Sequence, residues 1–151
     1  MSDSTYHYTE CGLNNIYLLN GYTFRDTPTG KAVSIKDADG LHKAIGLFLV
    51  RTKRDLSGEE FRFLRHEMLL SQSTLAKLLR VTDQTILRWE NGKVSIDKSS
   101  ESLLRLLYRE HVHDQDGKIS KVLKEIANLE EIINDKELLF EDTSKGWRAT
   151  A

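Results

Sequence analysis

Three polar side chains near the middle of the chain, Gln84, Arg88 and Asn91, are spaced three or four residues apart. Four residues of an α-helix turn through about 400°, so these groups lie on roughly the same side of a helix. Ile86 and Trp89 point roughly the opposite way and would face a core. Amide and guanidinium groups can form paired hydrogen bonds with the edges of adenine and guanine. This spacing therefore predicts a helix that reads bases in the major groove of duplex DNA.

The expected DNA contacts form two sets. The first reads base edges, with Thr85 and Leu87 contacting thymine methyl groups, and its members are Gln84, Thr85, Leu87 and Arg88. The second binds phosphates, which fixes the position of a protein on DNA without reading sequence, and its members are Gln72, Ser73, Asn91 and Lys93. For each member of the second set, the alternative is a solvated polar side chain that contacts no DNA.

Two short helices with a tight corner between them would position these side chains. Ser71 and Thr82 stand where each helix would begin, and hydroxyl side chains at such positions cap free backbone N–H groups. The dipeptide Arg80-Val81 would form the corner. The first helix carries an apolar stripe at helical spacing, made of Leu75, Ala76, Leu78 and Leu79.

Residues 64–92 closely resemble the helix-turn-helix of the Cro/repressor-type (XRE) family. The similarity lies in Leu64-Arg65, Leu70-Ser71-Gln72, Leu75-Ala76, Leu79, Val81 and Thr85-Ile86-x-Arg88-Trp89-Glu90-Asn91-Gly92. The resemblance implies that the second helix of the pair enters the major groove while the first crosses the DNA backbone. The alternative is an ordinary helical hairpin with a leucine-rich core. Such a hairpin does not require Ser-Gln at one helix start and Trp-Glu-Asn-Gly at the other helix end.

The same resemblance implies an ion pair between Arg65 and Glu90, which would join an earlier helix to the end of the second one. Glu90 lies about 40° from Ile86 around the helix axis, near its inward side. A carboxylate placed there needs a partner. We therefore expect an Arg65–Glu90 pair with a structural role.

The N-terminal part contains short β-rich runs. Residues 1–12 are expected to be irregular, and strands are expected at 15–19, 22–25 and 31–35, with turn residues between them. Together these strands predict a small antiparallel meander. A helix should follow from Asp37 or Asp39, with an apolar stripe made of Leu41, Ala44, Ile45, Phe48 and Leu49.

Further helices are expected on either side of the central pair. The run from Ser57 to Glu60 is a capping box that opens a helix through Met68. Asp97 or a nearby serine should open another through about His111, with a core side made of Leu103, Leu104, Leu106 and Leu107. A final amphipathic helix would pack on the body or form a short coiled coil, along Ile119, Val122, Ile126, Leu129 and Ile133. The tail around Trp147 is polar.

These elements predict an α+β fold that is mainly α. It would combine a small N-terminal antiparallel β meander, a five-helix XRE-type helix-turn-helix domain and a C-terminal helix. We expect residues 1–54 to form the meander and a helix, as a candidate region for dimerisation or partner binding. Residues 55–113 would be the DNA-binding domain, and residues 114–151 an amphipathic helix with a polar tail.

The net charge of −1 is unevenly distributed along the 151 residues. Residues 51–109 hold twelve Lys or Arg and eight Asp or Glu, whereas residues 110–151 hold six and ten. The positive surplus thus coincides with the expected DNA-binding region, where phosphate binding needs it. The acidic end would face away from DNA.

Other features of the sequence argue against several functions. The single cysteine, Cys11, excludes an internal disulfide and a cysteine-rich zinc module, so we expect no metal and no cofactor. The sequence contains no glycine-rich phosphate loop, nucleophile elbow or helical zinc pair, so we expect no enzymatic activity. Apolar runs fall well short of the roughly 18 residues of a membrane span. The N-terminus lacks the order of a signal peptide, so a cytoplasmic location without membrane contact is expected.

One helix-turn-helix presents few base contacts, so we expect a homodimer that represses a promoter through a palindromic operator. Residues 8–18 also resemble the segment before the helix-turn-helix in MqsA-type antitoxins, and the combined resemblance covers about residues 6–110. It implies a bacterial transcriptional regulator. The alternative function is that of an antitoxin, which masks a toxin protein and autoregulates its own promoter. A pure interaction module, which would select no DNA, is a third hypothesis.

Overall fold

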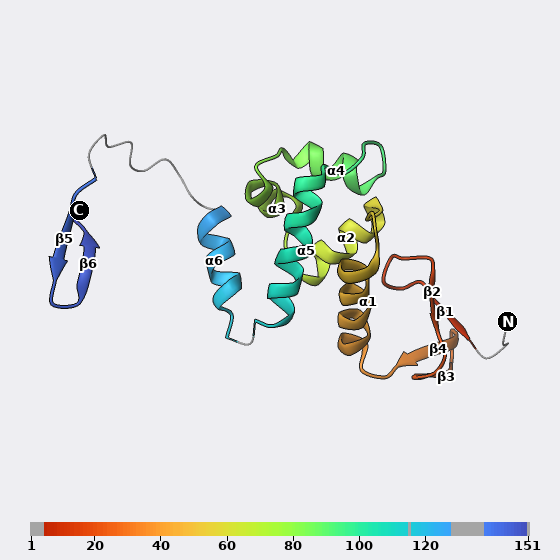
Figure 1. Cartoon of the computed structure of the whole chain (residues 1–151). Coiled ribbons are helices and arrows are strands. Elements are labelled where there is room, and N and C mark those ends of the chain that lie inside the picture. The colour runs from red at the N-terminus through yellow and green to blue at the C-terminus, as the bar shows by residue number, and fades with distance from the viewer. Residues whose placement is uncertain (1–4, 115, 128–137, 151) are drawn as a thin grey trace.

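The computed structural model describes residues 5–114, 116–127 and 138–150. This part of the chain contains six helices and three two-stranded antiparallel sheets. A single cluster of buried side chains joins the first two strands to the first five helices. The sixth helix packs beside the third, and the C-terminal hairpin lies on the side of the molecule opposite the N-terminal strands (Figure 1). None of the described helices has the length and apolar character needed to cross a membrane.

The N-terminal strands form two separate sheets, so the expected three-stranded meander is wrong. β1 (Tyr6–Tyr8) pairs with β2 (Ile16–Leu18), and β3 (Tyr22–Thr27) pairs with β4 (Gly30–Ile35). β1 lies inside the segment that was expected to be irregular. The reason is tertiary, because Tyr8 is buried against α1 and brings β1 to the edge of β2. Gly21 then joins the two sheets, with a φ of +81° and a carbonyl that accepts a hydrogen bond from Lys36 N.

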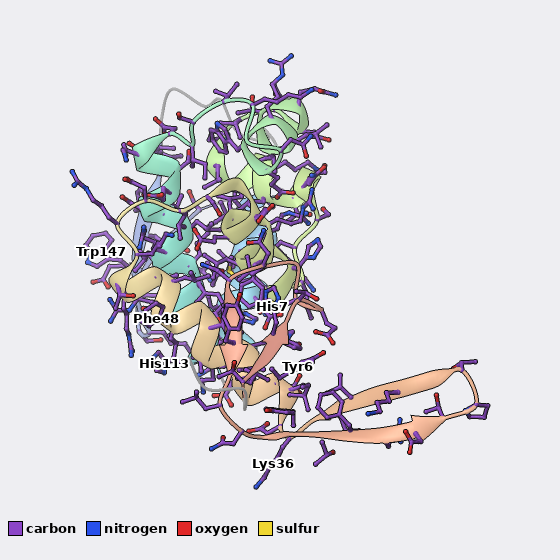
Figure 2. The ribbon with its side chains drawn as sticks, turned by 90° about the vertical axis from the view of Figure 1, so that its right-hand side faces the viewer. Tyr6, His7, Lys36, Phe48, His113 and Trp147 are labelled. Carbon is purple, nitrogen blue, oxygen red and sulfur yellow. The ribbon has the colours of Figure 1, made fainter. Side chains whose placement is uncertain are left out.

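The hairpin β3–β4 projects away from the helical body (Figure 2). Aromatic rings connect its base to β1, since the ring centroids of Tyr6 and Tyr22 lie 5.3 Å apart and those of Tyr6 and Phe24 lie 5.8 Å apart. Most side chains of the hairpin are exposed. A two-stranded ribbon is only marginally stable alone, so these aromatic contacts, together with the packing of Tyr22 and Ile35 against the core, tie it to the body.

Helix α1 (Ala38–Thr52) begins where it was expected, with Asp37 as its N-cap accepting a hydrogen bond from Gly40 N. Its buried face differs from the expected stripe. Gly46 and Val50 are buried, whereas Ala44 is exposed and Phe48 is 64% exposed. The cause is a close approach of α5, because a Cβ on Gly46 would lie only 2.0 Å from the hydroxyl oxygen of Tyr108. This approach sets the rotation of α1.

The next four helices confirm the caps expected from the sequence. They are α2 (Gly58–Glu67), α3 (Gln72–Leu79), α4 (Asp83–Glu90) and α5 (Lys98–Val112), capped by Ser57, Ser71, Thr82 and Asp97. The capping box of Ser57 and Glu60 is complete. On α5 the expected core stripe is partly wrong, since Leu103 and Leu106 are 37% and 55% exposed. The buried line of α5 instead runs through Leu104 and Tyr108.

The C-terminal part holds helix α6 (Lys118–Ala127) and a hairpin of β5 (Phe140–Thr143) and β6 (Gly146–Ala149). Leu123 and Ala127 pack with Leu78 of α3, whereas Val122 and Ile126 are 47% and 41% exposed. Leu129 and Ile133, the last residues of the expected seam, lie outside the described residues. The polar tail was not expected to form strands, yet its Trp147 is on β6 and is 74% exposed.

Candidate nucleic-acid interface

The corner between α3 and α4 is built by local hydrogen bonds. Ser71 Oγ accepts from Thr74 N at 3.0 Å, and Thr82 Oγ1 accepts from Thr85 N at 3.2 Å. Arg80 adopts the left-handed conformation with a φ of 61°, and Val81 N donates to Ala76 O. α3 therefore ends abruptly, and α4 begins at once in a new direction.

Substitution of Thr82 by alanine is expected to lower the free energy of unfolding by about 1 kcal/mol, because α4 would lose its N-terminal cap. Equilibrium unfolding in urea measures this loss. Thr82→Ser keeps the capping oxygen and serves as the control, with stability close to that of the wild type. Equal stability of the alanine and serine variants would contradict the role of this cap.

Helix α4 has one buried and one exposed face. Ile86 and Trp89 are 0% and 4% exposed and contact the core. The ring of Trp89 packs edge-on against that of Phe61, with centroids 5.7 Å apart. The four residues expected to read bases are less buried: Gln84, Leu87 and Arg88 are exposed, and Thr85 is half-buried. The Thr85 hydroxyl lies 2.9 Å from that of Thr82, so it belongs to the cap of its own helix.

The four residues expected to bind phosphates differ in their exposure to solvent. Ser73, Asn91 and Lys93 are exposed. Gln72 is half-buried, and its Nε2 donates to Glu90 Oε1 at 3.0 Å. One N–H group of its amide is thus used inside the protein. Sequence spacing gave no sign of this contact, because residues 72 and 90 are on different helices.

The structure brings Arg65 and Glu90 together in a buried, two-point contact. Arg65 Nε donates to Glu90 Oε2 at 2.6 Å, and a terminal guanidinium nitrogen donates to Oε1 at 3.0 Å. Arg65 also donates to the carbonyl of Leu70 at 2.9 Å. The Arg62 guanidinium lies 3.5 Å from Glu90 Oε1, a partner that sequence reasoning missed. The network links α2 to the end of α4 and to the residues just before α3.

The environment of Glu90 favours its charged form. Burial of the carboxylate acts to raise its pKa, but hydrogen bonds from Arg65 and Gln72, with the charges of Arg65 and Arg62, outweigh burial. The pKa of Glu90 is therefore lowered from its ordinary value. The carboxylate stays ionised near neutral pH and keeps its hydrogen bonds to both neighbours.

Acid is expected to remove the stabilisation that Glu90 provides. Because the pKa is lower in the folded chain, the contribution is complete above the unfolded value of 4.5 and is lost as pH falls through the folded value. Urea unfolding of wild type and Glu90→Gln, followed from neutral into acid pH, measures this effect. The stability difference between the two proteins should shrink as pH falls. A difference that is independent of pH would contradict the assignment.

A family model described as Helix-turn-helix matches residues 61–100, which include α3, the corner and α4. These residues form a helix-turn-helix domain. Domains of this family occur in DNA-binding regulators, as the XRE-type resemblance implied. No curated protein and no solved structure matches the chain.

Polar contacts join α5 to the end of α1 and to the segment before α2. Leu56 N donates to Glu101 Oε1 at 2.7 Å. The Arg105 guanidinium donates to the carbonyls of Leu49 and Val50 at 3.2 and 3.1 Å, which satisfies groups at the end of α1. In the described part of the chain, no group of three or more His, Cys, Asp or Glu side chains could hold a metal ion. The contacts of Glu101 and Arg105 hold α1 and the segment before α2 against α5.

Proposed function

We propose that this protein binds duplex DNA sequence-specifically and represses a promoter, with α4 lying in the major groove. The supporting observation is the division of α4 into two faces. Ile86 and Trp89 are used by the core, while Gln84 and Arg88 are exposed and free to bond to bases. A reading helix must be anchored on one side and open on the other.

Each exposed side chain has a proposed role. Arg88 reads a guanine and Gln84 an adenine, while Leu87 and the methyl group of Thr85 contact thymine methyl groups. The phosphate contacts come from polar side chains around the corner and after α4, namely Gln72, Ser73, Asn91 and Lys93. Gln72 would bind a phosphate through the amide N–H group that does not donate to Glu90.

A second copy of the chain completes the proposed operator complex, because one helix-turn-helix makes few base contacts. A groove of about 390 Å³ lies between β2 and α1, lined largely by apolar side chains that include Tyr17, Leu41 and Phe48. Tyr17 is 53% and Phe48 is 64% exposed. We propose that this surface forms the homodimer, which would remove these rings from water.

Selection of bound sequences from a pool of random DNA duplexes tests the proposal. Enrichment of a motif with two symmetric half-sites is the expected result, together with a solution mass twice the 17.3 kDa of one chain. Failure to enrich any motif would refute sequence-specific binding. A single unsymmetric motif and a monomeric mass would refute the dimer while leaving DNA reading intact.

The second candidate function is that of an antitoxin, and the same apolar surface supports it. A toxin protein would then cover Tyr17 and Phe48 in place of a second copy, and DNA binding would serve to autoregulate the promoter. Co-expression with the product of a small neighbouring reading frame tests this proposal. A stable complex that Phe48→Glu disrupts would support it. A purified protein that forms its dimer and binds no such product would contradict it.

A further inference from the structure

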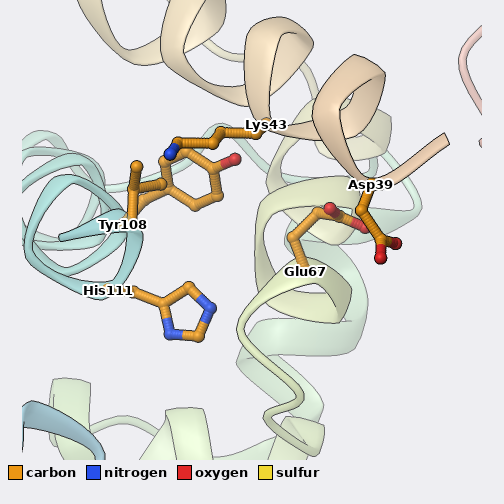
Figure 3. A pocket seen from close by; sticks show the side chains of 6 residues that line it. Asp39, Lys43, Glu67, Tyr108 and His111 are labelled. Atoms are coloured by element: carbon orange, nitrogen blue, oxygen red, sulfur yellow. The ribbon is translucent and has the colours of Figure 1, made fainter. Parts of the chain in front are cut away.

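A pocket of about 270 Å³ opens between α1, α2 and α5, and neither α3 nor α4 contributes to it. Its lining combines charged, aromatic and apolar side chains (Figure 3), namely Asp39, Lys43, Glu67, Tyr108, His111 and Val112. Its volume is at the small end for ligand sites in proteins. The site has no part in the proposed reading of DNA, so a different role has to be considered.

Opposite charges lie on different sides of this pocket. In Figure 3, Lys43 and His111 lie toward one side, while Glu67 and Asp39 lie toward the other. Neither Lys43 nor Asp39 forms an ion pair with any described residue. A ligand in the pocket would therefore meet donors at one end and acceptors at the other.

Residues outside the pocket orient the carboxylate of Glu67. One of its carboxylate oxygens, Oε2, lies 3.1 Å from His42 Nδ1. The other nitrogen of that ring, Nε2, lies 2.7 Å from the hydroxyl of Tyr8 on β1. These two contacts orient the carboxylate and leave Glu67 Oε1 available, so the acceptor end of the pocket is preorganised.

The side chain of Tyr108 lies between the two charged sides. Tyr108 is only 1% exposed, yet its hydroxyl forms no hydrogen bond with a described residue. Burial, and then the charge of Glu67, raises the pKa of Tyr108 to about 12, so the group stays protonated and can donate. In Figure 3 the hydroxyl lies between the Lys43 ammonium and the Glu67 carboxylate. No fully buried side-chain oxygen or nitrogen of the described residues lacks a partner, so this unbonded hydroxyl keeps access to the pocket, where a ligand could accept its hydrogen bond.

We propose that this pocket binds a small zwitterion with one ammonium and one carboxylate group, the chemistry of a free α-amino acid. The ligand carboxylate accepts hydrogen bonds from Lys43 Nζ and the Tyr108 hydroxyl. The ligand ammonium donates to Glu67 Oε1 and the Asp39 carboxylate. His111 and Val112 close the side of the pocket formed by α5.

Isothermal titration of the full chain with individual free amino acids, without DNA, tests the proposal. Acetate and methylamine each carry only one of the two charged groups and serve as control ligands. Saturable binding of at least one amino acid, with much weaker binding of both controls, is the expected result. If no amino acid binds at millimolar concentration, or if acetate binds equally well, the proposal is wrong. Because DNA is absent, this outcome is independent of the proposed regulatory function.

Two variants locate the binding site. Tyr108→Phe and Lys43→Met should each weaken binding by about tenfold or more, since each removes a hydrogen bond to a charged ligand group. Lys43 is exposed, so its replacement should leave the fold intact even if Tyr108→Phe is unstable. Lys121→Met, at an exposed position on α6, is the matched control and should bind as the wild type does. Wild-type affinity in Lys43→Met would overturn the assignment.

Discussion

Substitution of Arg65 by methionine is expected to lower the free energy of unfolding by about 3–5 kcal/mol, because it leaves a buried charge without its main partner. Glu90 is only 3% exposed and receives two hydrogen bonds from the Arg65 guanidinium. Gln72 and the more distant Arg62 would remain as its partners. A domain of this size has a total free energy of unfolding of about 5–15 kcal/mol, so the variant would lose a large part of its stability.

Equilibrium unfolding in urea measures this effect, and two further variants make the result specific. Arg109→Met removes an exposed arginine from α5 and should change stability by less than about 0.5 kcal/mol. The double variant Arg65→Met/Glu90→Leu removes both charges and should recover part of the loss, since apolar residues can replace a buried pair at little cost. If Arg65→Met is no less stable than Arg109→Met, the ion pair has no structural role.

Replacement of Arg88 by alanine is expected to weaken binding to the selected operator by about 1–3 kcal/mol, or roughly fivefold to 150-fold. The guanidinium is exposed on α4, and its removal should leave the core contacts of Ile86 and Trp89 unchanged. Because a base contact carries sequence information, preference at one operator position should also relax. Gel-shift titration against operators substituted position by position measures both effects.

Lys93→Ala is the matched comparison for Arg88→Ala. Lys93 is also exposed, but its proposed partner is a phosphate, so its loss should weaken binding to all operators about equally. It should also reduce the slope of log affinity against log salt concentration by about one, which corresponds to the loss of one phosphate contact. If Arg88→Ala behaves like Lys93→Ala, Arg88 binds the DNA backbone and does not read a base. Unchanged binding would remove Arg88 from the interface.

The sequence by itself determined where most helices begin. Ser57, Ser71, Thr82 and Asp97 each cap a helix through a backbone N–H three residues ahead, so the interaction is complete within four consecutive residues. The two-sided character of α4 follows from the helical period in the same way. Such features need no knowledge of distant parts of the chain, which is why pattern and spacing alone predicted them.

Only the tertiary structure decided which partners lie together when they are distant in sequence. β2 could pair with β1 or β3, and the burial of Tyr8 against α1 selected β1. The rotation of α1 depends on the approach of Tyr108 to Gly46, which are 62 positions apart in the printed chain. Several alternative pairings satisfy the local pattern equally well, and packing of the whole core selects among them. The hydrogen bond from Gln72 to Glu90 and the charged pocket beside Tyr108 arise in the same way.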